Sequence, residues 1–143
     1  TTNDANHISG PSRTGEGLFL AINRLLNKTP VPVDYISAHG TATLFNDEME
    51  SVAITRAGLQ SVPVNSFKGY WGHTLGAAGI IESIMCTYSI RNSVIFSTLG
   101  YREMGVTKPV LIADTPISKE INNCLKVASG FGGCNAAILF HKK

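Results

Sequence analysis

Two histidines are the residues of this sequence best placed to do chemistry. His39 directly follows the apolar run 35–38, which is typical of a buried strand. His73 lies further along, where a second strand gives way to a helix. Sites in open α/β sheets gather where strands end and helices begin. Because the start of a helix disfavours a charged imidazolium, we expect His73 to be neutral and to donate a hydrogen bond.

The residue types alone leave the role of the pair open. Two imidazoles at neighbouring strand ends can converge on one small group of a substrate. A histidine at a strand end is also often structural. The two rings could instead share a metal ion, although no third ligand accompanies them in the sequence.

The elements that must position these histidines alternate along the chain. Helical spacing and breakers predict helices over 16–27, from the N-cap Asn46 to Gly58, and over 74–91, the last with a core face of Ile80, Ile81, Ile84 and Met85. Strands are predicted over 35–38, 62–65 and 110–113, with a terminal hairpin of 125–128 and 136–140 around the turn 129–135. This order predicts an α/β fold with a mainly parallel sheet and an antiparallel hairpin at its end.

Composition narrows the class of protein. The 143 residues, 43% hydrophobic, suffice for a single domain, and a net charge of +2 without a basic run argues against nucleic acid as a partner. Apolar runs are too short for a bilayer, and three cysteines without a pairing motif favour a reducing compartment, so we expect a cytoplasmic protein that does not interact with membranes. A start at Thr1 suggests a fragment.

Four groups of residues resemble, in order and spacing, the motifs of elongating β-ketoacyl-acyl carrier protein synthases. They are His39-Gly40-Thr41-Ala42-Thr43 followed by Asp47 and Glu50, Asn65-Ser66-Phe67-Lys68, Gly72-His73-Thr74-Leu75-Gly76-Ala77-Ala78-Gly79, and Gly130-Phe131-Gly132-Gly133 followed by Asn135. Asp4-Ala5 and His7 match the segment that opens this part of the family's fold. The resemblance covers the whole chain.

The resemblance implies the C-terminal half of a thiolase fold, in which two similar halves pack face to face. The N-terminal half, which carries the family's nucleophilic cysteine, is absent, and none of Cys86, Cys124 and Cys134 takes its place. Cys86 is expected in the core. Cys134 stands where the family has threonine, and an activated thiol there is an open alternative. We expect an inactive fragment with an exposed apolar face where the other half belongs.

The reaction implied by the resemblance is a decarboxylative Claisen condensation. An acyl group moves to the absent cysteine, malonyl-acyl carrier protein loses carbon dioxide, and the resulting carbanion attacks the thioester. His39 and His73 would donate hydrogen bonds to the thioester oxygen on which charge develops. No cofactor is required, and the substrates arrive as phosphopantetheine thioesters of the acyl carrier protein. We expect no metal.

Other residues take supporting roles by the same resemblance. Thr41 and Thr43 back His39, and Lys68 with Glu82 would orient the His73 end of the site, unless the pair is an ordinary salt bridge. Phe131 would gate acyl entry between its glycines, unless it is a plain core aromatic. Ser129 and Trp71 depart from the family pattern and leave the acyl-chain preference open.

The expected partners are the N-terminal half of the same parent, the acyl carrier protein, and a second subunit in a homodimer or heterodimer. A competing function remains for the parent. Some relatives have lost the cysteine and act as non-catalytic subunits that determine chain length. The presence of His39, His73 and Lys68 favours the enzyme.

Overall fold

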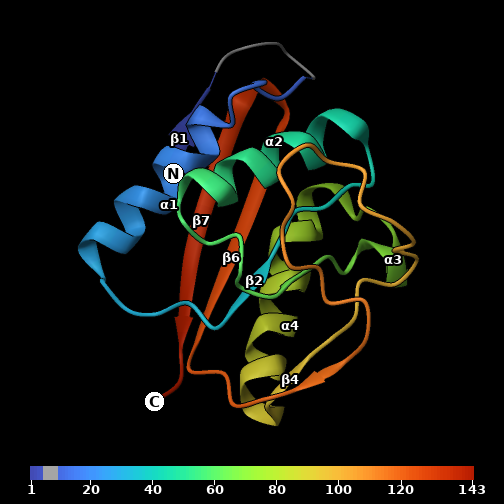
Figure 1. Ribbon diagram of the computed structural model, residues 1–143. Coiled ribbons are helices and arrows are strands. Elements are labelled where there is room, and N and C mark those ends of the chain that lie inside the picture. The colour runs from blue at the N-terminus through green and yellow to red at the C-terminus, as the bar shows by residue number, and fades with distance from the viewer. Residues whose placement is uncertain (5–9) are drawn as a thin grey trace.

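Residues 1–4 and 10–143 are described by a computed structural model, in which five strands form one mixed sheet (Figure 1). In sheet order they are β1 (Thr2–Asn3), β7 (Cys134–His141), β6 (Asn123–Gly130), β2 (Tyr35–Ser37) and β3 (Val64–Asn65). β2 is parallel to β3 and β6, whereas β7 is antiparallel to both β6 and β1. Since β7 alone opposes the other four strands of this sheet, the predicted fold class is confirmed. Ala5 and His7 of the opening motif lie outside the described residues.

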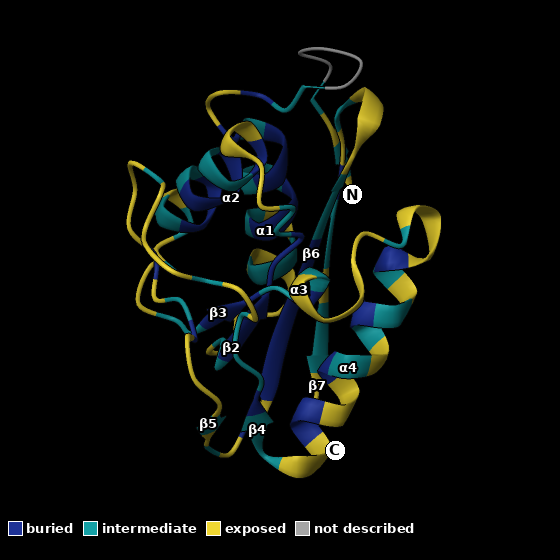
Figure 2. Cartoon of the chain, turned by 90° about the vertical axis from the view of Figure 1, so that its right-hand side faces the viewer, coloured by how far each residue is buried: buried dark blue, intermediate teal, exposed yellow. Residues whose placement is uncertain are grey.

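Helices cover both faces of the sheet. They are α1 (Glu16–Lys28), α2 (Leu44–Arg56), α3 (Lys68–Trp71) and α4 (Ala78–Asn92), with 3-10 turns η1 (Leu75–Ala77) and η2 (Phe131–Gly133). Figure 2 shows α1 and α2 on one side of the strands and α4 on the other. Two separate hydrophobic clusters follow from this layering, one beneath α1 and α2 and one beneath α4.

The alternation of side chains along β6 assigns residues to these two clusters. Leu125 and Val127 pack with α1 and α2, whereas Cys124 packs with Cys86 of α4. Successive side chains of a strand point to opposite faces. Lys126 therefore lies on the face of the sheet that α4 covers, as Cys124 does. Its charged side chain is buried there.

Helix α2 starts earlier than predicted. Its N-cap is Thr43 in extended conformation, and the carbonyl of Thr43 accepts a hydrogen bond from the backbone N–H of Asp47. Asn46 lies inside the first turn, where its amide donates to Glu50 at 2.7 Å. The prediction of Asn46 as N-cap was wrong because its side chain serves a residue one turn further along instead of the helix start.

The loops around the site also differ from the prediction. The segment 110–113 forms an isolated parallel bridge between Ile112 and Val64 instead of a strand, and the segment 66–72, for which no element was predicted, contains the short helix α3. The terminal turn is shorter than 129–135 because β6 and β7 extend to Gly130 and Cys134. A further antiparallel pair, β4 (Val94–Ile95) with β5 (Ile117–Ser118), was not predicted.

The face that α4 turns to the sheet differs from the predicted one. Ile80 and Ile84 are 63% and 59% exposed, and the buried residues of the helix include Glu82 and Cys86. Leu75 and Tyr88 are exposed as well, so a row of apolar side chains lies along the outer side of η1 and α4. In Figure 2 buried and exposed residues alternate along this helix. An exposed apolar face is therefore present on α4, whereas its contact with another half of the parent stays a prediction.

Leu125→Ala is expected to lower the free energy of unfolding by about 2–5 kcal/mol, because Leu125 is fully buried between β2 and β7 and truncation leaves a cavity. Urea unfolding monitored by circular dichroism measures this change. Leu111→Ala is the matched control, since Leu111 is half exposed. Equal losses in the two variants would contradict the assignment of Leu125 to the core.

Candidate active site

His39 is held by its backbone at the end of β2. Its N–H and that of Gly40 donate to the two carboxylate oxygens of Glu50, each at 2.7 Å, so α2 fixes the turn that follows the strand. Gly40 has φ +49°, and a Cβ there would lie 2.5 Å from Cβ of Ser66. Ser66 Oγ donates to the carbonyl of Gly40 at 2.7 Å. A glycine is therefore required directly after His39.

The structure brings His39 and His73 together. Their ring centroids are 5.1 Å apart and the rings are nearly perpendicular, at 81°. His39 is buried, with 7% of its surface exposed, whereas His73 is exposed. One imidazole thus lies at the base of the site and the other at its opening.

His73 is oriented by the backbone that follows it. The N–H of Leu75 donates to Nδ1 of His73 at 3.0 Å. Leu75 has φ +52°, in the left-handed region, so the helix cannot run unbroken from Thr74 and α4 begins only at Ala78. With Nδ1 occupied as an acceptor, the neutral ring carries its proton on Nε2.

His39 is oriented by Lys68. Nζ of Lys68 lies 3.2 Å from Nδ1 of His39, and it also donates to the carbonyl of His39 and to Oε1 of Glu82 at 2.6 Å. An ammonium group is only a donor, so Nδ1 of His39 is the acceptor and Nε2 carries the proton. Burial, followed by the positive charges of Lys68 and Lys126, lowers the pKa of His39 from 6.5 to about 3. His39 is therefore a neutral donor at physiological pH.

Lys68 and Glu82 form a pair as predicted, but Lys68 contacts His39 and not the His73 end of the site, and the pair is part of a larger buried cluster. The side chains of Lys68 and Glu82 are 7% and 1% exposed, and burial lowers the pKa of Lys68 although Glu82 acts in the opposite direction. Nζ of Lys126, from β6, lies 2.5 Å from Oε2 of Glu82. Sequence reasoning missed Lys126 because it lies inside an apolar run. A lysine within an apolar run could have indicated a buried ion pair, since lysine is almost never fully buried unless it is paired.

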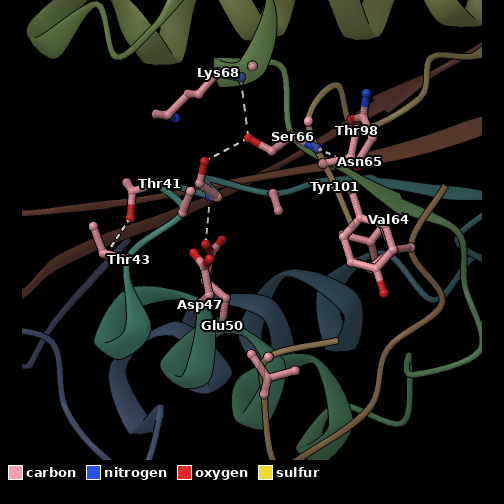
Figure 3. Close-up of a pocket in the computed structure, with 18 of the residues that line it drawn as sticks. Thr41, Thr43, Asp47, Glu50, Val64, Asn65, Ser66, Lys68, Thr98 and Tyr101 are labelled. Atoms are coloured by element: carbon pink, nitrogen blue, oxygen red, sulfur yellow. Dashed lines mark hydrogen bonds between the residues drawn. The ribbon is translucent and has the colours of Figure 1, made fainter. Parts of the chain in front are cut away.

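A cleft of about 680 Å³ opens beside the histidines, between α2, α3 and the segment 98–106. Thr41 and Thr43 lie at its edge, and their hydroxyls are 2.7 Å apart. Figure 3 shows them next to Asp47 and Glu50 of α2. Burial raises the pKa of both carboxyl groups. The cleft thus offers hydroxyl, ammonium and imidazole donors above the buried Glu50 and the partly buried Asp47.

The remaining candidate residues lie as follows. Phe131 is 80% exposed in η2, so within this chain it is not the core aromatic that was kept as an alternative, and Gly132 beside it has φ +76°. Trp71 stacks on Phe67 with ring centroids 5.5 Å apart. Ser129 donates to Asn135 at 2.8 Å.

The cysteines divide into two kinds. Cys86 and Cys124 are buried, which confirms the core position predicted for Cys86, and Cys134 is exposed at the start of β7. Among residues 1–4 and 10–143, no group of three or more His, Cys, Asp or Glu side chains is arranged to hold a metal ion. None of the helices in this part of the chain combines the length and apolar character needed to cross a membrane.

Comparison with known proteins identifies relatives of the chain. Residues 1–102 match the family model of the β-ketoacyl synthase C-terminal domain. The chain is 36% identical to a mitochondrial 3-oxoacyl-[acyl-carrier-protein] synthase of Schizosaccharomyces pombe, over 97% of this chain and 35% of that protein. It is also 36% identical to 3-oxoacyl-[acyl-carrier-protein] synthase 2 of Rhizobium meliloti, over 97% of this chain and 34% of that protein. The chain thus spans about a third of the length of these relatives.

Solved structures show the same fold. One match is a chain in the structure of a type II polyketide synthase acyl-carrier protein in complex with its ketosynthase bound to the hexaketide. Its TM-score is 0.89 and its identity 30%, over 99% of this chain and 36% of that chain. The ishigamide ketosynthase/chain length factor matches with a TM-score of 0.91 and 28% identity, over the same shares. These ketosynthase neighbours confirm the prediction of a thiolase fold.

The neutral state of His39 makes stability depend on pH. Its pKa of about 3 in the folded protein lies below the unfolded value of 6.5, so the unfolded state binds more protons in between. This contribution is complete above pH 6.5 and is lost as the pH falls toward 3.

His39→Gln is therefore expected to flatten the decline of stability between pH 7.5 and about 4.5. Urea unfolding across this range measures the slope in both proteins, and each protein at pH 7.5 is its own reference. A variant that loses as much stability on acidification as the wild type would show that the pKa of His39 is not lowered in the folded state.

Proposed function

Because the chain belongs to the β-ketoacyl synthase family, as its C-terminal domain, we propose that its full-length parent is a 3-oxoacyl-[acyl-carrier-protein] synthase. The parent would be an acyltransferase that condenses an acyl thioester with malonyl-acyl carrier protein in fatty acid, polyene or polyketide synthesis. The chain by itself lacks the nucleophilic cysteine and is inactive on this proposal.

The observation that carries the proposal is a pair of imidazoles that both present Nε2–H. His39 and His73 lie 5.1 Å apart by ring centroid, and each has its Nδ1 engaged as an acceptor. When the malonyl C–C bond breaks, carbon dioxide leaves and the electron pair becomes the enolate of the thioester. Two donors aimed at that oxygen stabilise it without moving a proton.

Condensation follows from the same enolate. Its α-carbon attacks the acyl thioester on the cysteine of the other half, and the thiolate leaves as the new carbon–carbon bond forms. Lys68 and Glu82 hold His39 for this step, and Thr41 and Thr43 at the edge of the cleft would hydrogen-bond the phosphopantetheine arm. The exposure of Phe131, next to Gly132 with its φ of +76°, supports its role as the acyl gate. No cofactor enters this scheme.

The partners follow from the exposed surface and from the neighbours. The apolar row of Leu75, Ile80, Ile84 and Tyr88 is the surface we assign to the N-terminal half of the parent. Acyl carrier protein and chain length factor are partners of ketosynthases in the solved complexes, and we propose carrier protein and a homodimeric or heterodimeric assembly for the parent. The cytoplasmic location stays a prediction.

A second function is a non-catalytic subunit that determines chain length. The observation that favours this function is that the structural neighbours include complexes of a ketosynthase with a chain length factor. The residue at the nucleophile position of the N-terminal half decides between the two. A cysteine there supports the synthase, and its replacement supports the chain-length subunit.

Release of carbon dioxide from malonyl-acyl carrier protein by the intact parent tests the proposal. His39→Ala and His73→Ala are each expected to lower the rate by about 100- to 1,000-fold, as loss of one oxyanion donor does elsewhere. Lys142→Ala is the control, since Lys142 is exposed and pairs with Glu120 at the surface. An inactive wild-type parent, or histidine variants as active as the wild type, would refute the synthase.

Ile84→Asp tests the proposed contact with the N-terminal half. In the intact parent it should lower the melting temperature strongly, because a carboxylate would be buried against that half without a partner. Arg24→Asp, on the exposed side of α1, is the control with an introduced acid. Thermal unfolding measures both. Equal melting temperatures for the two variants would place Ile84 in solvent in the parent.

A further inference from the structure

One carboxylate beneath the site is shared by two buried lysines. Oε1 of Glu82 pairs with Lys68 at 2.6 Å and Oε2 pairs with Lys126 at 2.5 Å. All three side chains are at most 7% exposed. Lys68 comes from α3, Glu82 from α4 and Lys126 from β6, so the cluster joins three elements under the end of β2.

Lys126 also supports the strand that leads into His39. Its Nζ donates to the carbonyl of Ala38 at 3.0 Å and lies 3.4 Å from that of Ser37, and Lys68 donates to the carbonyl of His39 itself. Three successive carbonyls at the end of β2 thus face the two ammonium groups. The carbonyls and Glu82 together offset the cost of burying Lys126.

The division of Glu82 between two lysines determines what Lys68 can do. Because Lys126 occupies Oε2, Lys68 binds one oxygen only and keeps a further N–H for Nδ1 of His39. Oε2 accepts no hydrogen bond from the described residues, so the ion pair with Lys126 is what balances its charge. Without Lys126, the nearest cation to Oε2 would be Lys68. The ammonium of Lys68 would then shift toward Glu82 and away from His39.

We propose that Lys126 is a positioning residue for His39: by occupying the second oxygen of Glu82, it keeps Lys68 against Nδ1 and thereby Nε2–H of His39 directed at the reacting oxygen. Neither the family match nor the motifs of the sequence assign a role to Lys126. The catalytic consequence rests on the proposed decarboxylation, whereas the effect on the imidazole itself does not.

The charge of the cluster supports the same conclusion. The titratable groups that face His39 come from every element packed around it: Glu50 from α2, Lys68 from α3, His73 before η1, Glu82 from α4 and Lys126 from β6. With Glu82 and both lysines ionised, the cluster carries one net positive charge, and Lys126 contributes to the lowered pKa of His39. Lys126→Met makes the cluster neutral, so the pKa of His39 rises toward its usual value.

The experiment uses the intact parent labelled with ¹³C at Cε1 of histidine. From pH 8 down to about pH 4 the wild-type His39 resonance should keep the chemical shift of a neutral imidazole, because its pKa is about 3. In Lys126→Met the resonance should begin to titrate within this range, with a pKa at least about one unit higher, a tenfold change in proton affinity. Carbon dioxide release should fall about tenfold at pH 7, more at lower pH, with an unchanged KM for malonyl-acyl carrier protein, because the loss affects the transition state only. Lys142→Met is the surface control and should match the wild type.

Neutralising Glu82 supplies the second test. The double variant Glu82→Gln/Lys126→Met restores the net charge of +1 and leaves no carboxylate to draw Lys68 away. The pKa of His39 in the double variant should return to the wild-type value of about 3. Its rate should lie within about threefold of that of Glu82→Gln alone, because a full additional loss from Lys126→Met would show that Lys126 does not act through Glu82.

These outcomes separate the inference from the proposed function. If Lys126→Met folds with an unchanged His39 titration and rate, Lys126 has no positioning role. If Lys126→Met alone does not fold, the double variant decides the question. A rate of carbon dioxide release tenfold below that of Glu82→Gln would then also overturn the proposal. If the wild-type parent releases no carbon dioxide, the proposed function fails, and the His39 titrations still decide the role of Lys126.

Discussion

The buried carboxylate of Glu82 is the interaction on which the arrangement of the site depends. It lies on α4, beneath the sheet, and it binds ammonium groups from α3 and β6 that also donate to the carbonyls at the end of β2. A buried ion pair contributes little net stability compared with apolar residues of similar size, but removing one partner leaves an uncompensated charge and is costly. The cluster therefore acts less as a source of stability than as a constraint on where His39 can lie.

This constraint explains why α4 has an unusual surface. A helix that covers a sheet normally directs its large apolar residues inward. Here the inward face carries Glu82, Cys86 and Ser89, and large residues such as Ile80 and Ile84 lie on the outer side. Periodicity alone predicted the opposite for these isoleucines, because it shows that a helix has an apolar stripe but not which layer the stripe faces. An exposed stripe of this kind is the physical basis for assigning a second packing surface to α4.

The sequence predicted the main elements and the location of the site because both rest on short-range signals. Helix α1 and the hairpin of β6 and β7 follow from hydrophobic period and glycine placement, and the two histidines follow from strand ends. Long-range polar contacts could not be predicted in this way. Glu50 is named in a motif, yet its hydrogen bonds to the backbone of His39 and Gly40 depend on how α2 crosses the end of β2. The role of Lys126 depends on the register of β6 against β2, which places it opposite Ser37.

The two histidines reach the same donor state by different means, and this difference has a consequence for the chemistry. Nδ1 of His73 accepts from a backbone N–H that exists at every pH, and its geometry depends on the left-handed conformation of Leu75. Nδ1 of His39 accepts from an ammonium group, so its orientation depends on charge and burial. The exposed ring is thus held by local backbone and the buried ring by a network that spans the sheet. Perturbing the core beneath α4 would therefore affect His39 first, while changes in the 72–75 turn would affect His73 alone.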